Sequence, residues 1–299
     1  MMKKTIDKSD VRRMFSPLPD RVNKGRMGRV LVVCGSYDES GLSMCGAAYF
    51  AANAAYRTGA GIVEIFTPRE NYSSLASLVP EAVFSLYGYD ESESDVCDRL
   101  ALEMSKSDAV VIGCGLGKSQ LSKKMASTVL RLAKCPLVVD ADALNILSEE
   151  PAMWDMLRAE QRRRVVITPH PGEMSRLCGR NLTDILADTV GVARDFAAEK
   201  GIVCLLKDHN TVISDGAVIY INQTGNAGMA SAGMGDVLAG IIGSIAAREH
   251  RCGNDNDYLL CAAIGAYLHG AAGDAASEKL GQYSLMASDL LAEIPAIIG

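Results

Sequence analysis

The segment that says most about this chain reads NQTGNAGMASAGMGDVLAG and runs from Asn222 to Gly240. Small residues dominate it up to Asp236, and apolar residues then recur at helical spacing. This pattern predicts a flexible loop that runs into a helix N-terminus, where unpaired backbone amides and the helix dipole favour an anion. Gly233 and Gly235 would let the backbone come close to a phosphate, because they carry no Cβ atom.

Asp236 is the unexpected member of this segment, because a phosphate repels a carboxylate placed beside it. The residue is therefore a candidate base, which takes a proton from a hydroxyl as that hydroxyl attacks a terminal phosphate. The alternative is a glycine-rich turn in which Asp236 only caps the helix. The segment alone does not separate these two interpretations.

The composition of the 299 residues limits the function classes. A net charge of -6 and a pI of about 5.3 argue against a surface for nucleic acid or an anionic membrane. No apolar run approaches the roughly 20 residues of a membrane span, and the N-terminus is too charged for a signal peptide. Nine cysteines without CxxC spacing and four scattered histidines give a zinc site little support. We expect free thiols, a cytoplasmic location and no bound metal held by the protein alone.

Short β-branched runs alternate with helical patterns along the first two thirds of the chain. The expected strands are residues 30–34, 62–66, 109–112, 137–139, 165–168 and 203–207, and the expected helices between them include residues 46–57, 121–133 and 185–200. A hairpin around Asp215-Gly216 follows, and then helices at residues 236–248, 258–276 and 287–297. No linker divides the chain. We therefore expect one α/β domain over residues 1–299, with a central, mostly parallel sheet and helices on both faces.

Polar clusters follow several of the expected strands. They are GCGLG at residues 113–117, DADALN at residues 140–145, TPHPGE at residues 168–173, and Lys207. Each cluster alone has a structural explanation, such as a helix cap at Asp142 or a stiffened loop around His170. Ligands of open α/β sheets bind beyond the carboxyl ends of the strands, so these clusters together predict a site at that edge.

The heptapeptide GCGLGKS at residues 113–119 is close to a Walker A loop but has one residue too few before its Gly-Lys pair. The curl of amides in that loop depends on the spacing, so we interpret Lys118 and Ser119 as an ordinary helix start. The Rossmann fingerprint also fails, because these glycines are spaced G-x-G-x-G and do not follow the first strand.

Taken together, the motifs resemble, in order and across most of the chain, the ADP- or ATP-dependent NAD(P)H-hydrate dehydratases, a branch of the ribokinase-like fold. The matching segments are KGRMGRVLVVCGS from Lys24, GAA from Gly46, RTGAG from Arg57, the polar clusters above, LLKDHNTVISDG from Leu205, and the glycine-rich segment. TPHPGE and the glycine-rich segment are the specific parts. The Gly-x-Gly-Asp ending alone is shared by all ribokinase-like kinases.

The resemblance implies repair of hydrated NADH and NADPH, (6S)-NADHX and (6S)-NADPHX, with ADP or ATP as co-substrate and Mg²⁺ beside the phosphates. Asp236 is the implied catalytic base, and the amides of Gly233, Met234 and Gly235 form the implied anion hole. The implied contacts are Ala47, Gly115, Asn145, His170 and Asp236 for the hydrate, and Lys207, Asp208, His209, Asn210, Thr211 and Gly235 for the nucleotide. The resemblance also implies a homo-oligomer, with a tetramer suspected. Because the motifs start near residue 24, we expect no N-terminal epimerase domain.

Two residues depart from the family pattern: Met234 replaces a small hydroxyl residue, and Cys114 replaces proline. A kinase of the same fold that acts on hydroxymethylpyrimidine, hydroxyethylthiazole or pyridoxal would use the Gly-x-Gly-Asp segment equally well, but TPHPGE and DADALN favour the dehydratase. A nucleotide sensor without catalysis is the third alternative, and it gains nothing from Asp236 beside phosphate. Neither ADP nor ATP is favoured by the sequence.

Overall fold

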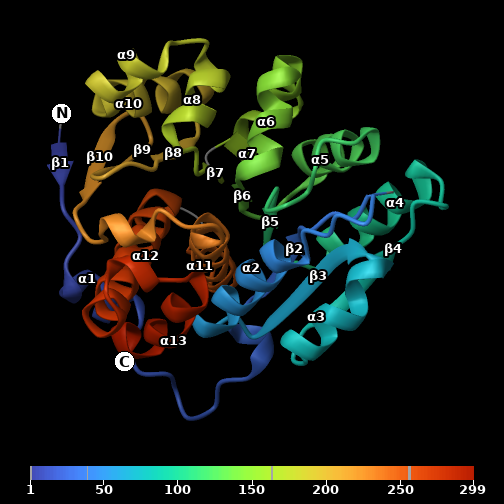
Figure 1. The fold of residues 1–299 in the computed structure, drawn as a ribbon, viewed down its shortest axis with the longest axis horizontal. Helices are drawn as coiled ribbons and strands as arrows, with labels where there is room; N and C mark the ends of the chain where they lie inside the picture. The colour runs from blue at the N-terminus through green and yellow to red at the C-terminus, as the bar shows by residue number, and fades with distance from the viewer. Residues whose placement is uncertain (1, 39, 163, 255–256) are drawn as a thin grey trace.

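The computed structural model describes residues 2–38, 40–162, 164–254 and 257–299, and its described strands form one sheet (Figure 1). The sheet order is β1-β10-β9-β8-β7-β6-β5-β2-β3-β4. The strands are β1 (Met2–Lys4), β2 (Arg29–Val33), β3 (Ile62–Pro68), β4 (Val83–Tyr87), β5 (Ala109–Ile112), β6 (Leu137–Val139), β7 (Val165–Ile167), β8 (Val203–Leu206), β9 (Thr211–Ser214) and β10 (Val218–Asn222). Only β9 runs antiparallel to its neighbours among these strands, which confirms the mostly parallel sheet.

Helices cover both faces of the sheet (Figure 1). One face carries α1 (Lys8–Met14), α2 (Cys45–Arg57), α3 (Tyr72–Leu78), α11 (Met234–Arg251), α12 (Tyr258–Leu280) and α13 (Ala287–Ile298). The other carries α4 (Glu93–Met104), α5 (Gln120–Leu132), α6 (Ala141–Glu149), α8 (Pro171–Cys178), α9 (Leu182–Ala187) and α10 (Thr189–Lys200). The short α7 (Ala159–Arg162) precedes β7.

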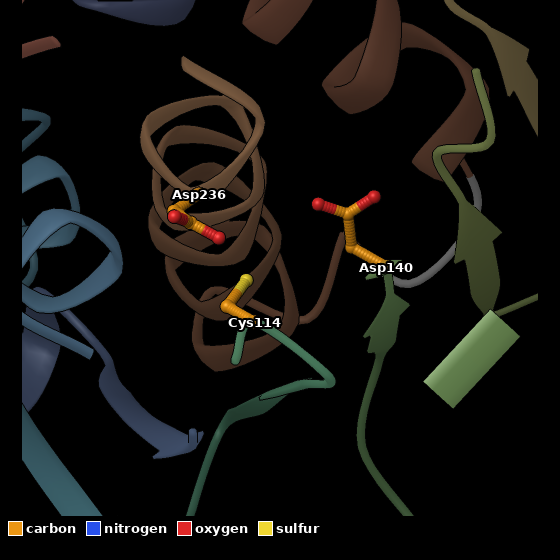
Figure 2. A group of neighbouring side chains, drawn as sticks. All are labelled: Cys114, Asp140 and Asp236. Atoms are coloured by element: carbon orange, nitrogen blue, oxygen red, sulfur yellow. The ribbon is translucent and has the colours of Figure 1, made fainter. Parts of the chain in front are cut away.

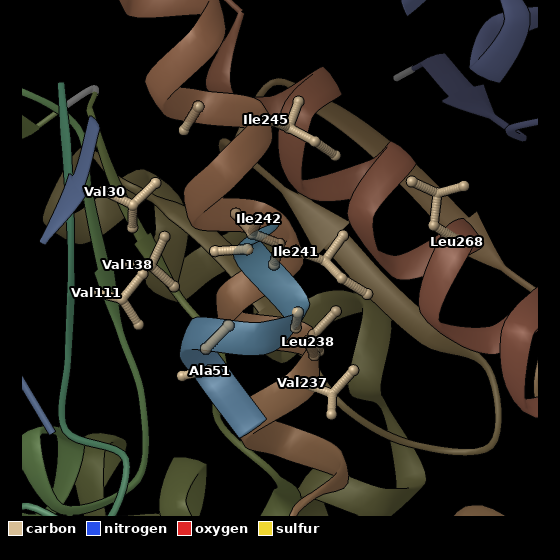
Figure 3. Close-up of a cluster of buried hydrophobic side chains, with 14 of the residues drawn as sticks. Val30, Ala51, Val111, Val138, Val237, Leu238, Ile241, Ile242, Ile245 and Leu268 are labelled. Carbon is tan, nitrogen blue, oxygen red and sulfur yellow. The ribbon is translucent and has the colours of Figure 1, made fainter. Parts of the chain in front are cut away.

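The central strands are buried on both faces, which explains their continuous apolar sequences. In β2, Val30 and Val32 contact the core on the α11 side, whereas Leu31 and Val33 contact the opposite core. Helix α11 packs against both the sheet and α2, and α2 also contacts the sheet (Figure 3). A Cβ atom added to Gly240 would lie 2.1 Å from the carbonyl oxygen of Ala51, so this glycine permits the close approach of the two helices.

The structure differs from the sequence prediction in three respects. The expected helix over residues 185–200 is divided into α9 and α10, because the Asp188 carboxylate accepts the Gly191 amide (2.8 Å) and starts a new helix. The outer strands β1 and β4 were not expected, because both lie at sheet edges where polar or exposed residues interrupt the apolar pattern. Helix α12 is also long and apolar enough to cross a membrane, contrary to the expectation from the sequence. Its most apolar window is 67% buried in the fold, and it is a core helix.

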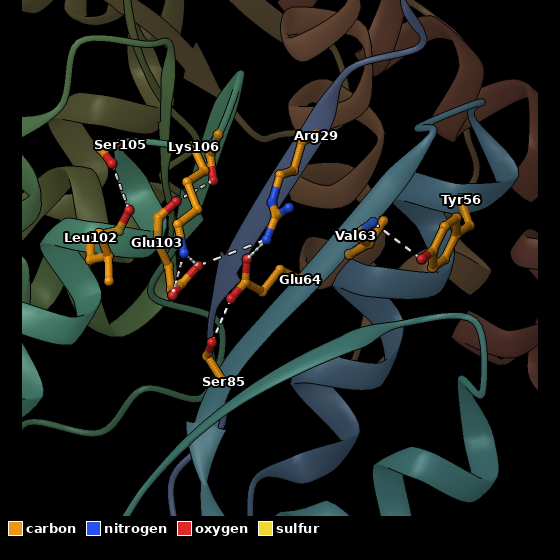
Figure 4. A network of polar contacts seen from close by, with 10 residues as sticks. Arg29, Tyr56, Val63, Glu64, Ser85, Leu102, Glu103, Ser105 and Lys106 are labelled. Atoms are coloured by element: carbon orange, nitrogen blue, oxygen red, sulfur yellow. Dashed lines mark hydrogen bonds and ion pairs between the residues drawn. The ribbon is translucent and has the colours of Figure 1, made fainter. Parts of the chain in front are cut away.

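A buried ion pair holds the first strands together away from the polar clusters (Figure 4). The Glu64 side chain of β3 is 1% exposed and pairs with Arg29, the first residue of β2. The Arg29 guanidinium also faces Glu103 at 3.8 Å, and the Ser85 hydroxyl of β4 donates to Glu64. A carboxylate buried without such partners would cost several kcal/mol, so this network serves the fold rather than the site.

Candidate active site

Three polar side chains converge at the carboxyl ends of β5 and β6 (Figure 2). Cys114 follows β5, Asp140 follows β6, and Asp236 lies in the first turn of α11. The thiol sulfur and one carboxylate oxygen from each aspartate lie within 4.8 Å of one another. Because β5 and β6 are adjacent parallel strands, their ends bring the first two residues together, as the sequence predicted for this edge.

The backbone beside Asp140 is strained. Ala141 has a φ of 48°, which is costly for a residue with a side chain, on the order of 1–3 kcal/mol. The neighbouring strand end is packed so closely that a Cβ atom on Gly113 would lie 1.9 Å from the Asp140 carbonyl oxygen. The rigid surroundings therefore fix the direction of the Asp140 side chain toward α11.

Helix α11 begins as predicted. Gly233 is its N-cap with a φ of 88°, and a Cβ atom there would lie 2.7 Å from the ring of Phe50. The Val237 amide makes the first bond of the helix, to the Gly233 carbonyl oxygen (3.0 Å). The amides of Met234, Gly235 and Asp236 precede that bond and have no helical acceptor. These amides, at the positive end of an 18-residue helix, can bind a phosphate.

The pKa of the Asp236 carboxyl is set by its surroundings. Burial raises its pKa to about 7, and the negative charge of Asp140 adds to this effect. A hydrogen bond from Cys114 and the positive charge of Lys207 act in the opposite direction. A carboxylate with a pKa near neutrality can accept a proton and later release it, which suits a general base.

Lys207 provides positive charge beside the start of α11. Its Nζ atom lies 2.9 Å from Asp140 Oδ1 and 4.0 Å from Glu173 Oε2. Burial lowers the pKa of Lys207, but the two carboxylates outweigh burial and raise it overall, so the ammonium stays charged. A Cβ atom on Gly235 would lie 3.3 Å from both Lys207 Nζ and Asp140 Oδ2, which places the helix start against this ion pair.

A cavity of about 650 Å³ extends from Lys207 and the start of α11 between the ends of β8 and β9 and helix α12. Most residues expected on the nucleotide side line it, namely Lys207, Asp208, His209, Thr211 and Gly235. Met234 also lines it, whereas Asn210 lies in the same turn outside the lining. The cavity is large enough for a mononucleotide, since small-ligand sites span about 300–1,000 Å³.

The glycine-rich loop is anchored, although the sequence suggested flexibility. Asp274 of α12 accepts hydrogen bonds from the Gly225 amide (2.8 Å) and the Asn226 side chain (2.9 Å). The Thr224 hydroxyl donates to the Tyr267 carbonyl oxygen (3.0 Å). Helix α12 therefore holds the far wall of the cavity in place.

His269 of α12 contacts the start of α11, and the sequence analysis missed this residue. Its Nε2 atom lies 2.9 Å from the Met234 carbonyl oxygen. Burial lowers the pKa of His269 to about 4, so the ring is neutral and donates from Nε2. The signal in the sequence was a single histidine within the apolar α12, a pattern that is also common in cores without a site.

His170 caps a helix at the edge of the cavity, and its ring stays half exposed there. Its Nδ1 atom accepts the amides of Gly172 (3.0 Å) and Glu173 (3.3 Å), and the Glu173 carboxylate accepts the His170 amide (2.8 Å). The ring thus bonds the nearby backbone, as the structural interpretation of TPHPGE expects, and these bonds cap α8, which was not predicted. Because Nδ1 accepts, the neutral ring carries its proton on Nε2, and the side chain is 51% exposed at the cavity.

The remaining hydrate-side residues lie on α2, in the loop after β5 and on α6. A Cβ atom on Gly115 would lie 2.9 Å from the Ala47 Cβ, so these two residues form one wall. Asn145 lies on α6, and its side-chain oxygen accepts from Arg176 Nε at 3.0 Å.

The Walker-like segment is an ordinary helix start, as expected. The Ser119 hydroxyl caps α5 by accepting the Ser122 amide (3.1 Å). The Lys118 ammonium pairs with Glu149 (2.8 Å), and neither Lys118 nor Ser119 lines the cavity at α11. This segment therefore does not face the cavity at α11.

Comparison with protein families and sequences gives a consistent result. The family model described as NAD(P)H-hydrate dehydratase matches residues 30–296. An ADP-dependent (S)-NAD(P)H-hydrate dehydratase of Neisseria meningitidis is 36% identical over 90% of this chain and 83% of its own length. A bifunctional NAD(P)H-hydrate repair enzyme of Moorella thermoacetica is 40% identical over 95% of this chain. The chain spans about half (52%) of that bifunctional relative.

Solved structures agree in fold. A ribokinase-like superfamily protein of Enterococcus faecalis superposes with a TM-score of 0.81 at 25% identity, covering 99% of this chain and 95% of its own. An ADP/ATP-dependent NAD(P)H-hydrate dehydratase of Bacillus subtilis, co-crystallized with ATP and Mg²⁺, superposes with a TM-score of 0.78 at 27% identity, covering 98% and 96%. The ribokinase-like fold expected from the sequence is confirmed.

Proposed function

The chain belongs to the NAD(P)H-hydrate dehydratase family, and we propose that it removes water from hydrated NADH or NADPH with consumption of ADP or ATP. The observation that carries this proposal is the position of Asp236. Its carboxyl has a pKa of about 7 and lies in the first turn of α11, beside the Lys207 ammonium and the free amides of the helix. This arrangement pairs a base for a hydroxyl with a site for a terminal phosphate.

The proposed reaction has two stages. Asp236 takes the proton of the ring hydroxyl while the hydroxyl oxygen attacks the terminal phosphorus of ADP or ATP. The bond between that phosphorus and the leaving AMP or ADP breaks. The amides of residues 233–236 and the Lys207 ammonium stabilise the charge on the transferred group. The ring nitrogen then supplies electrons as the phosphorylated oxygen leaves as phosphate, and the adjacent carbon loses a proton to restore the double bond.

The two substrates occupy opposite sides of Asp236 in this proposal. The nucleotide lies in the cavity beside Lys207, with residues 208–211 and Gly235 as its contacts. The hydrated ring lies toward the wall of Ala47 and Gly115. His170 lines the cavity assigned to the nucleotide, so it would contact the ring where the two substrates meet. Asn145, on α6, is a further proposed contact of the hydrate. These assignments follow from the cavity and from the family motifs, and variant kinetics would test each residue.

Mg²⁺ fits this site as an ion carried by the phosphates. The candidate cluster of Cys114, Asp140 and Asp236 offers a thiol as its third ligand, whereas Mg²⁺ prefers oxygen. Asp140 already pairs with Lys207. We therefore propose that the nucleotide supplies most of the ligands and that the ion neutralises phosphate charge, as it commonly does in nucleotide sites.

Two alternatives remain testable beside the dehydratase. A vitamin-precursor kinase would use the same phosphate site and stop at a phosphorylated product, but the family match over residues 30–296 favours the dehydratase. A nucleotide sensor would need no base, and a carboxylate with a raised pKa beside the phosphate site argues for catalysis.

The deciding experiment follows the absorbance of NADH or NADPH formed from its hydrate, with ADP and ATP supplied in turn. Release of inorganic phosphate is measured in parallel. The proposal expects one phosphate for each reduced nucleotide formed. A stable phosphorylated product without phosphate release would identify a kinase, and binding of nucleotide without either product would identify a sensor.

Location and assembly are also proposals. All nine cysteines are free thiols, which supports a reducing compartment such as the cytoplasm. Leu280, Tyr283 and Met286 are exposed near the turn between α12 and α13, which supports burial of this region in a homo-oligomer. Light scattering of the wild type and of Tyr283→Glu would test that assembly, and a monomeric wild type would contradict it.

A further inference from the structure

A polar side chain of the cavity, His269 of α12, has no part in the proposed reaction so far. Its Nε2 atom lies 2.9 Å from the carbonyl oxygen of Met234, the first residue of α11. The neutral ring has one N–H, which it donates to that carbonyl oxygen. His269 therefore binds the backbone of the same turn that offers its free amides to a phosphate.

The position of the His269 ring is fixed by the packing of α12 against the glycine-rich loop. A Cβ atom on Gly270, the next residue, would lie 2.2 Å from the hydroxyl oxygen of Thr224. This glycine lets the helix come close to the loop, and the Thr224 hydroxyl also donates to the Tyr267 carbonyl oxygen at 3.0 Å. The ring is thus presented to α11 from a closely packed helix.

The hydrogen bond from His269 reaches a peptide group that has two active ends. The Met234 carbonyl and the Gly235 amide belong to one planar unit, in which the C=O and N–H bonds point in opposite directions. The Gly235 amide is one of those at the start of α11 that have no helical acceptor. A donor on the carbonyl oxygen polarises the whole unit and makes its N–H a stronger donor. A phosphate bound to Gly235 would therefore feel the presence of His269 without touching the ring.

The side chains at the start of α11 increase the importance of these amides. Met234 has a thioether, which cannot donate a hydrogen bond, and residues 233 and 235 are glycines. Lys207 brings positive charge, but its ammonium also binds Asp140 at 2.9 Å. The direction and strength of the free amides thus contribute directly to how a terminal phosphate is held.

We infer that His269 is a positioning residue for phosphoryl transfer, which acts on the terminal phosphate through the Met234–Gly235 peptide group. The inference rests on the proposed function. The bond from Nε2 holds this group in the orientation that directs the Gly235 amide at the phosphate, and it strengthens that amide as a donor. Because negative charge grows on the transferred group during the reaction, the effect is larger in the transition state than in the bound nucleotide.

The test compares two variants of His269. His269→Phe keeps a planar ring but has no N–H to donate. His269→Gln is the matched rescue, because the glutamine amide nitrogen lies as many bonds from Cβ as Nε2 does and can donate to the same carbonyl oxygen. Melting temperatures establish that both are folded. If the phenylalanine variant does not fold, His269→Asn replaces it, because its amide is one bond too short to reach Met234.

Calorimetric titrations with AMP, ADP and ATP separate positioning from a simple role in shaping the cavity. AMP lacks the phosphate that would reach the amides of α11, so its Kd should stay at the wild-type value in every variant. The Kd of ADP and ATP should rise about two- to tenfold in His269→Phe, which corresponds to one hydrogen bond, and return close to the wild-type value in His269→Gln. These titrations need no hydrate, so they test the inference even if the chain does not dehydrate one.

Turnover gives a second measurement. With saturating ADP or ATP, kcat for the hydrate should fall in His269→Phe by at least the factor seen in binding, while the KM for the hydrate stays unchanged. His250→Phe is the matched control, because it makes the same substitution near the other end of α11 and outside the cavity, and it should change neither constant.

Equal weakening of AMP, ADP and ATP in His269→Phe would mean that the ring only shapes the cavity or contacts the nucleotide directly, and it would overturn the inference. Wild-type binding of all three nucleotides would overturn it as well. So would a folded glutamine variant that binds ADP and ATP no better than the phenylalanine variant does.

Discussion

The thiol of Cys114 lies against the carboxylate of Asp236, with its sulfur and a carboxylate oxygen within 4.8 Å of each other (Figure 2). A hydrogen bond from this thiol lowers the pKa of Asp236 and so offsets part of the effect of burial. Cys114 therefore contributes an interaction that the proline usual at this family position cannot make, since proline has no side-chain donor.

Replacing Cys114 with alanine should shift the pH dependence of activity. Loss of a hydrogen bond to the ionised carboxylate, worth about 0.5–1.5 kcal/mol, should raise the pKa of Asp236. The acidic limb of the kcat/KM profile should therefore move to higher pH. Activity should fall most near pH 7 and least above pH 8. Cys114→Ser keeps a donor and should retain the wild-type profile. An alanine variant with an unshifted profile and normal folding would contradict the role of the thiol.

Asp236→Asn should stop turnover and preserve nucleotide binding. The asparagine has a similar size but cannot accept the proton, and loss of a general base costs about 10²–10⁴ in rate. Calorimetric titration with ADP should show equal or tighter binding, because a negative charge beside the phosphates is gone. Turnover within a few-fold of the wild type would rule out Asp236 as the base.

The pKa of about 7 at Asp236 predicts opposite pH trends for activity and stability. Activity should rise between pH 5 and 8 as the base ionises. The raised pKa means that folding favours the protonated form, so stability from this group is present in acid and is lost as pH rises through 7. The gain in Tm of Asp236→Asn over the wild type should therefore grow between pH 4 and 7 and then level off. A constant difference in Tm across this range would contradict the raised pKa.

The strands at the centre of the sheet could be predicted because burial on both faces leaves apolar runs such as residues 30–34 and 137–139. The meeting of the polar clusters at the carboxyl ends of these strands could also be predicted, because adjacent parallel strands end at the same edge of the sheet. The edge strands β1 and β4 lack that pattern because they are partly exposed.

The contacts that tune the site could not be predicted from local sequence. The meeting of Cys114 with Asp236 joins residues 122 positions apart (236 − 114), and only the packing of α11 on β5 creates it. The same holds for His269, which meets Met234 only because α12 crosses beneath the loop. A sequence pattern shows which side chains are available, and tertiary packing decides which of them touch.

His170 offers a variant pair that separates capping from substrate contact. His170→Ala removes both the cap made by Nδ1 and the donor at Nε2. His170→Asn restores a good helix cap but places no donor where Nε2 was. Loss of the cap should cost about 0.5–2 kcal/mol of stability, so the alanine variant should melt at a lower temperature than the asparagine variant.

If Nε2 also binds the hydrated ring, both variants should lose kcat/KM for the hydrate by the equivalent of one hydrogen bond, about 0.5–1.5 kcal/mol. The KM for ADP should stay near the wild-type value in each, because the proposed phosphate contacts are made by α11 and Lys207. Burial lowers the pKa of His170, so the ring is neutral above pH 7 and this loss should not depend on pH there. Should His170→Asn recover both the melting temperature and the kinetic constants, the ring acts only as the cap of α8 and does not contact the substrate.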